Sequence, residues 1–286
     1  MADARADALK VRRIAAFTRD GRGGNPAGVV LAETLPDAAT MQAVAAEVGY
    51  SETAFAAPAE DGWRVRYFSP ETEIPFCGHA TIALGAALAQ AHGAGAFPLL
   101  LRNGRIEVEA GMRDGAWRAV LRSPPTRSAP APGLIVAEAL DLFGYDAGAL
   151  DPTLPPALAH AGADHLIVAL AAREALAAMA YDFSAGRDFM RRCGLTTVAF
   201  VHREAERSFQ ARNAFAGGGV VEDPATGAAA AALAGMLRDL GALAGGELVV
   251  LQGEDMGRPS RIEVSFTSER GASVSVGGAC ADIACP

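Results

Sequence analysis

The sequence predicts an α+β protein of two similar domains, each with a curved, mostly antiparallel sheet around a buried central helix. Three observations lead to this prediction. The chain has 286 residues, which is enough for two domains of roughly 140 residues each. Two helical segments are apolar on nearly every face, so each must be surrounded by protein. Short strand-like runs flank both of these segments.

The first half contains one ordinary helix and the first central helix. The ordinary helix begins at Asp37, a good N-terminal cap, and ends at Gly49, which suits a left-handed C-terminal cap. The first central helix is predicted over about 78–92, where nearly every side chain is apolar. The predicted strands of this half cover residues 27–31, 50–55, 64–68, 106–109 and 117–121.

The second half repeats this pattern around a second apolar helix. That helix is predicted over about 224–240, with Asp223 as its N-cap and Pro224 at its first position. The similarity of the two halves outside the helix starts is weak, so internal duplication is only suggested. The predicted strands of this half cover residues 197–202, 209–212, 248–251, 262–266 and 273–276.

A proline-rich stretch divides the two halves. Residues 125–132 are predicted to be a linker, because proline and small polar residues are typical of domain boundaries. The N-terminal domain would then cover residues 1–124 and the C-terminal domain residues 133–286. The last strand could return to the first domain.

The composition excludes several classes of partner. Hydrophobic residues make up 51% of the chain and charged residues 20%, so it can bury a large core. The 25 basic and 33 acidic residues give a net charge of -8, which argues against nucleic acid and anionic membranes as partners. Lys10 is the only lysine, which leaves no suitable residue for a pyridoxal Schiff base or a phosphate-binding loop.

The cysteines and the hydropathy indicate a cytoplasmic protein without cofactors. Cysteine spacing matches neither a CxxC pair nor a zinc pattern with histidine, so we expect no metal and no disulfide. The N-terminal residues lack the apolar segment of a signal peptide. The longest apolar stretch, residues 227–237, is well short of the roughly 20 residues that a membrane span needs. The cysteines are Cys77, Cys193, Cys280 and Cys285.

The starts of the two central helices could bind a carboxylate. Gly78 and His79 lie at one start, and Gly227 and Ala228 at the other. Unpaired backbone N–H groups and the positive end of the helix dipole favour an anion there. Both starts could face one cleft if the halves are related by a pseudo-twofold axis. Glycine near a helix start is, however, more often simple turn chemistry.

Four titratable side chains lie beside these helix starts: Glu52, Glu73, His79 and Asp223. Glu52 lies within a predicted strand, and if it faces inwards its desolvated carboxylate would suit a general acid or base. If it faces outwards, it is an ordinary surface residue. His79 could be a core histidine, and Asp223 could act only as a helix cap.

Six segments in order carry a resemblance to a known family. Together they resemble the motifs of the PhzF (phenazine biosynthesis) isomerase family, and they extend over nearly the whole chain. The segments are GNPAGV at 24–29, SETAF at 51–55, RYFSP at 66–70, EIPFCGHAT at 73–81, EDPATG at 222–227 and QGEDMGRPS at 252–260.

The resemblance implies a fold, an assembly and a chemistry. The fold would be diaminopimelate-epimerase-like, with the site in the cleft between two domains and commonly a homodimer. The chemistry would be cofactor-free proton transfer, in which Glu52 removes a proton from a carbon atom and returns one elsewhere. His79 and Asp223 match residues that orient the substrate. The amides that match the carboxylate-binding region of the family are those of Gly78, His79, Gly227 and Ala228.

The chain departs from the family pattern at Ala228, where the best-known members carry serine, so the substrate stays open. Cys77 stands in the place of one acid/base cysteine of the related two-base epimerases, but Thr226 stands where the second would be. The leading hypothesis is an isomerase or epimerase of a small carboxylated molecule that uses Glu52. The alternatives are a racemase that uses Cys77 and a non-catalytic binding or scaffold protein on the same fold.

Overall fold

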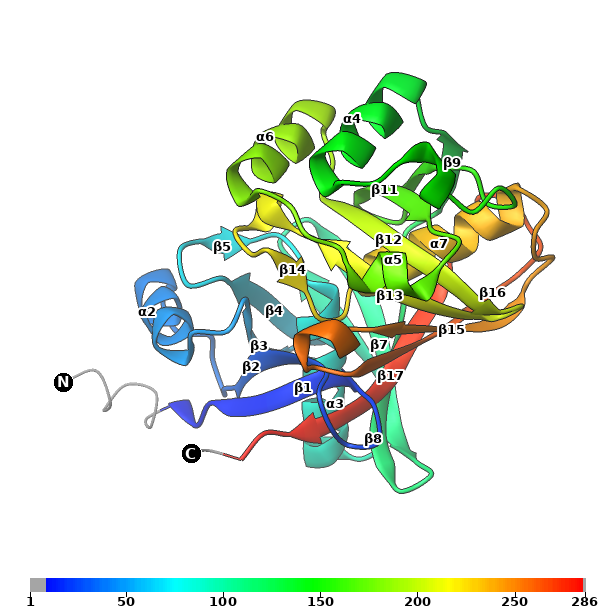
Figure 1. Ribbon diagram of the computed structural model, residues 1–286. Coiled ribbons are helices and arrows are strands. Elements are labelled where there is room, and N and C mark those ends of the chain that lie inside the picture. Colours follow the sequence, from blue (N-terminus) through cyan, green and yellow to red (C-terminus); the bar gives the residue numbers. More distant parts are fainter. Residues whose placement is uncertain (1–8, 285–286) are drawn as a thin grey trace. The chain divides into compact units, whose positions relative to one another are not determined.

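The computed structural model describes residues 9–284, which form two compact units (Figure 1). Within the described residues, unit 1 contains 9–122 and 277–284, and unit 2 contains 123–276. The last strand of the chain therefore enters unit 1 after the chain has formed unit 2. Cys285 lies outside the described residues.

Unit 1 is a sheet that closes around one helix. The pairs β2–β3 and β4–β6 are parallel, whereas β1–β2, β3–β4, β6–β7 and β7–β8 are antiparallel. β17 pairs with both β1 and β8, and this closes the ring of strands. Figure 1 shows β17 in red beside β1 in blue. The strands are β1 (Arg12–Thr18), β2 (Asn25–Leu31), β3 (Thr53–Ala59), β4 (Gly62–Phe68), β5 (Glu73–Ile74), β6 (Gly95–Leu101), β7 (Gly104–Arg113), β8 (Ala116–Arg122) and β17 (Ser275–Asp282).

The helix inside this ring is α3 (Gly78–His92), the range that the apolar pattern indicates. All its residues from His79 to Ala89 are buried, and it packs against β1, β2, β7 and β8. Gly85 allows a close approach of α3 to β7, because a Cβ atom there would lie 2.6 Å from Cγ2 of Val108. The small side chains of α3 therefore fit it inside the closed sheet.

The second helix of unit 1 is α2 (Ala38–Val48), which packs on β3 and β4. Its N-cap is Asp37, whose carboxylate accepts a hydrogen bond from the Thr40 amide, and its C-cap is Gly49 with φ of 70°. Both caps match the predicted ends of the helix. Met41 and Val44 pack with Phe55 in a core between the helix and the sheet.

Unit 2 contains seven main strands, a short two-residue strand and four helices. The pairs β11–β12 and β13–β15 are parallel, and the pairs β9–β10, β10–β11, β12–β13 and β15–β16 are antiparallel. Its elements are β9 (Arg127–Pro130), α4 (Gly133–Phe143), β10 (Ala157–His160), β11 (Asp164–Ala169), α5 (Arg173–Ala177), α6 (Phe183–Cys193), β12 (Thr197–Ala205), β13 (Ser208–Ala214), β14 (Glu222–Asp223), α7 (Gly227–Asp239), β15 (Gly246–Gln252) and β16 (Ser260–Phe266).

The two units repeat one arrangement, which confirms the predicted fold class. Strands β10 to β16 pair with one another in the pattern of β1 to β7, including both parallel pairs. In each unit the buried helix, α3 or α7, precedes the strand that forms the second parallel pair. α7 is buried from Ala229 to Arg238 and packs against β9, β10 and β16.

Two details differ from the sequence predictions. The predicted linker at 125–132 contains β9, which pairs with β10 in an antiparallel arrangement. The second central helix begins at Gly227 with Thr226 as its N-cap, not at Pro224 with Asp223. Asp223 instead lies in β14 and pairs with Asn213. Among the helices formed by residues 9–284, none is both long and apolar enough to cross a membrane.

Candidate active site

Glu52 lies in the loop immediately before β3, not within a strand as predicted. Its carbonyl oxygen accepts a hydrogen bond of 3.1 Å from the Gly28 amide, which attaches this loop to β2. The side chain is only 15% exposed. Of the two orientations that the sequence left open, the structure therefore has the inward one.

The Glu52 carboxylate contacts the imidazole of His79. Oε2 of Glu52 lies 3.2 Å from Nε2 of His79, whose side chain is 8% exposed in the first turn of α3. Oε2 is itself buried, and no donor in the described part of the chain makes a hydrogen bond of good geometry to it. The pair therefore places a carboxylate oxygen, able to accept a proton, beside the start of α3.

Cys77 adds a thiol to this pair. It is the N-cap of α3 and is buried, and its Sγ lies 3.3 Å from Nδ1 of His79. Neighbouring positions at one helix start do not by themselves imply that the side chains of Cys77 and His79 touch. The structure brings the two side chains together, and the donor atoms of Glu52, Cys77 and His79 all lie within 4.8 Å of one another.

Tyr67 and Thr81 hold the start of α3 from within unit 1. The Thr81 hydroxyl donates to the Cys77 carbonyl at 2.7 Å, and the Tyr67 hydroxyl lies 2.7 Å from the Thr81 oxygen. Burial raises the pKa of Tyr67 well above its ordinary value, so the phenol stays protonated and donates to Thr81. This pair was not predicted from the sequence, although Tyr67 lies in the RYFSP motif and Thr81 ends the EIPFCGHAT motif.

Among the helices that residues 9–284 form, α3 and α7 begin without a side-chain cap, and so do α4 and α5. Aspartate side chains cap α2 and α6. Within residues 9–284 no side chain caps α3 or α7, and neither has an acidic residue in its first turn. The first backbone N–H groups of both central helices are therefore left for another acceptor.

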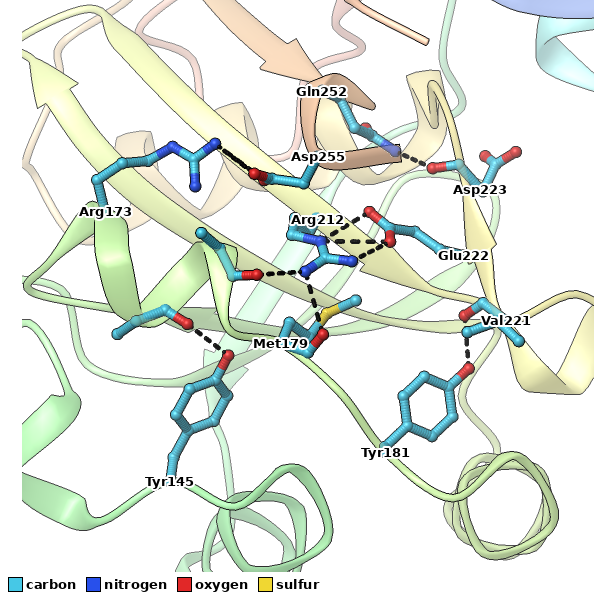
Figure 2. Close-up of polar contacts among 12 residues, drawn as sticks. Tyr145, Arg173, Met179, Tyr181, Arg212, Val221, Glu222, Asp223, Gln252 and Asp255 are labelled. Atoms are coloured by element: carbon cyan, nitrogen blue, oxygen red, sulfur yellow. Dashed lines mark hydrogen bonds and ion pairs between the residues drawn. The ribbon is translucent and has the colours of Figure 1, made fainter. Parts of the chain in front are cut away.

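The hydroxyl of Thr226 does not cap α7 because other side chains use it. It donates to the Asp223 carboxylate and accepts a hydrogen bond of 2.5 Å from Nδ2 of Asn213. Gln252 donates to the Asp223 carbonyl at 2.6 Å, as Figure 2 shows, and to Thr226 Oγ1 at 3.1 Å. Asn213 and Gln252 are buried, and the sequence motif at 252–260 was the one signal that could have identified Gln252.

An ion pair precedes each central helix, and the pair of unit 2 is the more buried of the two. In unit 2, Nη2 of Arg212 lies 2.6 Å from Oε2 of Glu222, and Arg212 also donates to the Met179 carbonyl at 3.0 Å (Figure 2). In unit 1, Arg66 and Glu73 make the equivalent pair at 2.6 Å. The hydrogen bonds from Arg66 lower the pKa of Glu73, which stays ionised and structural. Both pairs fix the short strand that leads into the helix start.

Further contacts in unit 2 surround the Arg212 pair. The Tyr181 hydroxyl donates to the Val221 carbonyl at 2.5 Å, next to β14. Burial raises the pKa of Tyr181 to about 12, so it remains a donor at neutral pH. Arg173 contacts Asp255 at 2.9 Å, which attaches α5 to the 252–260 motif (Figure 2).

Comparison with known proteins identifies the family of this chain. The family model PhzC-PhzF, described as phenazine biosynthesis-like protein, matches residues 14–284. An uncharacterized isomerase of Mesorhizobium japonicum is 33% identical, covering 94% of each chain. A trans-2,3-dihydro-3-hydroxyanthranilate isomerase of Pseudomonas fluorescens is 33% identical, covering 86% of each chain.

Solved structures share the fold at lower identity. A phenazine biosynthesis protein of the PhzF family from Bacillus anthracis superposes with a TM-score of 0.86 at 23% identity, covering 96% of each chain. A probable proline racemase from Agrobacterium radiobacter superposes with a TM-score of 0.64 at 12% identity, covering 96% of this chain and 90% of the other. At these identities the likeness establishes the fold alone.

Proposed function

This chain belongs to the PhzC-PhzF family of phenazine biosynthesis-like proteins, and from this membership we propose that it is a cofactor-independent isomerase or epimerase of a small carboxylated molecule. Glu52 is the proposed general acid/base, which takes a proton from a substrate carbon and returns one to the carbon framework. His79 and Asp223 are proposed to orient the substrate. The isomerase names of the relatives support the reaction class.

One observation carries the proposal: Oε2 of Glu52 lies 3.2 Å from Nε2 of His79. A base that removes a proton from carbon must be held in a fixed place with an open lone pair. The side chain of Glu52 is largely buried, and Oε2 has no good hydrogen-bond donor within residues 9–284. His79 fixes the carboxylate and can itself hydrogen-bond to a polar substrate group.

The amides at the helix starts are proposed to bind the carboxylate of the substrate. Loss of a proton next to a carboxylate spreads negative charge onto its oxygens, and preorganised N–H groups stabilise that charge. The missing side-chain caps on α3 and α7 support this role. The amides concerned belong to Gly78, His79, Gly227 and Ala228.

Hydrogen exchange in D₂O tests the proposal. Small aromatic, cyclic and amino acids, together with trans-2,3-dihydro-3-hydroxyanthranilate, would be incubated with the protein and scored for deuterium by mass spectrometry. Glu52→Gln keeps the size of the side chain and removes the ionisable group, so exchange should fall by about 10²–10⁴-fold. Glu47→Gln, on the exposed side of α2, makes the same chemical change as a control. Wild-type exchange in Glu52→Gln would remove Glu52 from the mechanism.

A racemase that uses Cys77 is the second candidate, because the thiol lies 3.3 Å from Nδ1 of His79. Thr226 has no thiol at the corresponding start of α7, so the second base of such an enzyme is missing. Cys77→Ser should therefore lose less than about tenfold in exchange rate, far less than Glu52→Gln. Equal losses with unchanged thermal stability would favour the racemase.

The proposed assembly rests on the family resemblance, and the proposed location rests on the cysteine pattern and the N-terminal sequence. We propose a cytoplasmic homodimer, and analytical ultracentrifugation of the full chain would measure the mass in solution. A mass of one chain across micromolar concentrations would contradict the dimer.

A further inference from the structure

Three side chains at the start of α3 bring different metal-binding atoms together. They are the carboxylate of Glu52, the thiol of Cys77 and the imidazole of His79, with donor atoms within 4.8 Å of one another. We propose that this cluster binds one zinc ion, which blocks Glu52 and so inhibits the enzyme reversibly. The inhibition rests on the proposed function, whereas the binding does not.

The distances suit a tetrahedral ion. With Zn–N and Zn–O bonds near 2.1 Å and a Zn–S bond near 2.3 Å, tetrahedral donors lie roughly 3.3–3.6 Å apart. Nε2 of His79 is 3.2 Å from Oε2 of Glu52 and 3.9 Å from Sγ of Cys77. Side-chain shifts of a few tenths of an ångström would bring these two distances to those of a zinc site. The third pair, Glu52 and Cys77, lies within 4.8 Å, so the carboxylate and the thiol would have to approach one another by up to about 1 Å when the ion binds.

The donor set favours zinc over the hard cations. Mg²⁺ and Ca²⁺ prefer oxygen ligands, whereas a thiolate with an imidazole and a carboxylate suits zinc. Oε2 of Glu52 is a buried acceptor that no side chain or amide in the described chain satisfies with good geometry, so a cation would supply its missing partner. Cys77 and His79 are buried as well, which strengthens ionic contacts with the ion.

The third ligand explains why the sequence predicted no metal site. Cys77 and His79 alone match no zinc spacing, and Glu52 comes from a separate loop before β3. Within residues 9–284 no other three histidine, cysteine or acidic side chains lie as close. Unit 2 has Thr226 where unit 1 has Cys77, so one ion per chain is expected.

A bound ion would block proton transfer directly. Zinc would occupy the lone pair of Glu52 that receives the substrate proton, and it would displace the thiol proton of Cys77 to solvent. Three protein ligands leave a fourth position for water. The ion is an inhibitor in this proposal, so the zinc-free protein is the active form.

The absorption spectrum of bound Co²⁺ shows which side chains are ligands, and this measurement needs no substrate. The full chain would be treated with a chelator, desalted and titrated with Co²⁺. We expect one equivalent to give visible bands of a tetrahedral site and a near-ultraviolet thiolate charge-transfer band, all removed by added Zn²⁺. Cys77→Ser should lose the charge-transfer band and bind Zn²⁺ at least about tenfold more weakly, since even outer partners of metal ligands contribute this much.

The control thiol is Cys193 in α6, so Cys193→Ser should bind both metals like the wild type. Glu52→Gln is the second ligand variant and should keep the thiolate band while weakening Zn²⁺ binding, even if Cys77→Ser fails to fold. Six-coordinate spectra, or equally tight Zn²⁺ binding in both ligand variants, would overturn the site.

The exchange assay tests the blocking role. Zn²⁺ should inhibit the wild type at concentrations near its measured Kd, a chelator should restore the rate, and Mg²⁺ should have no effect. The ratio of rates with and without Zn²⁺ should approach one in Cys77→Ser. Activation by Zn²⁺ would overturn the inhibitory role. If the zinc-free protein exchanges no substrate, the proposed function fails, and the cobalt titration alone decides the site.

Discussion

Glu52 of unit 1 and Thr197 of unit 2 occupy corresponding positions in the repeated fold. Glu52 lies three residues before Phe55, which pairs with Arg66 of the next strand. Thr197 lies three residues before Phe200, which pairs with Arg212 of the next strand. The Thr197 hydroxyl lies 2.7 Å from Nδ1 of His165, a contact that is buried. The backbone frame is therefore common to both units, but only unit 1 places a carboxylate at this position.

His165 should make the stability depend on pH. Burial lowers the pKa of His165 to about 4, whereas the unfolded side chain titrates near 6.5. Between these values the unfolded chain binds more protons, so the free energy of unfolding rises with pH and is lost as the pH falls through this window. Acidification through the whole window should lower the free energy of unfolding by about 3 kcal/mol, because the two pKa values differ by about 2.5 units and one unit corresponds to 1.36 kcal/mol.

Urea unfolding between about pH 4 and pH 7 measures this effect. The free energy of unfolding should fall more steeply on acidification in the wild type than in His165→Gln, which has no ionisable group. Thr197→Val is the control, because it removes the hydrogen bond but keeps the imidazole, so it should retain the steep dependence. Parallel curves for wild type and His165→Gln would contradict the prediction.

Part of the fold could be predicted because some elements carry their own start and stop signals. α2 has Asp37 and Gly49 at its ends, and sequence analysis found both. α4 was missed because Pro132 precedes it and no side chain in the described chain caps it. α6 was missed although Asp182 and Gly194 give it both signals, so it could have been predicted.

Strand β11 was not predicted from the sequence for a different reason. Its residues after Asp164 are all buried, and residues 166–169 form a continuous apolar run without the alternation that identifies a strand. The sequence suggested that the last strand could return to the first domain, but its partners β1 and β8 could not be identified, because this pairing joins residues far apart in the sequence. Sequence patterns report local preferences, and these contacts are not local.

The candidate site also contains residues that could be selected from the sequence and residues that only the folded chain brings together. Glu52, His79 and Asp223 lie in quoted motifs and could be selected from the sequence. Asn213 and Gln252 support Asp223 from β13 and β15, and only the folded chain brings them to Thr226. The contact between Cys77 and His79 likewise depends on side-chain directions in the first turn of α3, which spacing alone does not give.

Gly85→Ala should destabilise unit 1. The new Cβ atom would lie 2.6 Å from Cγ2 of Val108 and 3.2 Å from Cβ of Ala119. Overpacking costs about 1–3 kcal/mol, whereas exchange of glycine for alanine in a helix gains up to about 1 kcal/mol. We expect a net loss of about 1–2 kcal/mol in the free energy of unfolding.

Gly133→Ala is the matched control, because Gly133 starts α4 and a Cβ atom there would meet nothing within 4 Å beyond its own helix and chain neighbours. It should leave the free energy of unfolding unchanged or slightly raised. Urea denaturation measures both variants. Equal stability of the two would show that α3 can shift away from Val108 without cost.

Ala228→Ser tests the departure from the family pattern. The substitution adds a hydroxyl beside the uncapped amides of α7, where the side chain is half-buried. If Ala228 reflects a changed substrate, kcat/KM for that substrate should stay the same or fall. Ala231→Ser, on a fully buried face of α7, should lose about 1–3 kcal/mol of stability, which gives the cost of an unpartnered hydroxyl. A higher kcat/KM in Ala228→Ser would show that the hydroxyl of the family pattern still suits the substrate.

Asp223→Asn combined with Glu52→Gln tests whether both carboxylates act on one substrate. Asn keeps the size of Asp and can still accept the Thr226 hydroxyl, so the helix start should remain intact. Asp223→Asn and His79→Gln should each weaken binding and turnover together, because both residues are proposed to orient the substrate. The rate of deuterium exchange under single-turnover conditions measures each variant.

The double variant should be little slower than Glu52→Gln alone, because residues that act as one unit lose activity non-additively. The control is the double variant of Asp223→Asn and Glu47→Gln. Its exchange rate should equal that of Asp223→Asn alone, since Glu47 is exposed on α2. If the losses from Glu52→Gln and Asp223→Asn simply multiply, the two groups act independently. Asp223 would then be a structural partner of Thr226 in unit 2, and Glu52 would orient its substrate with His79 alone.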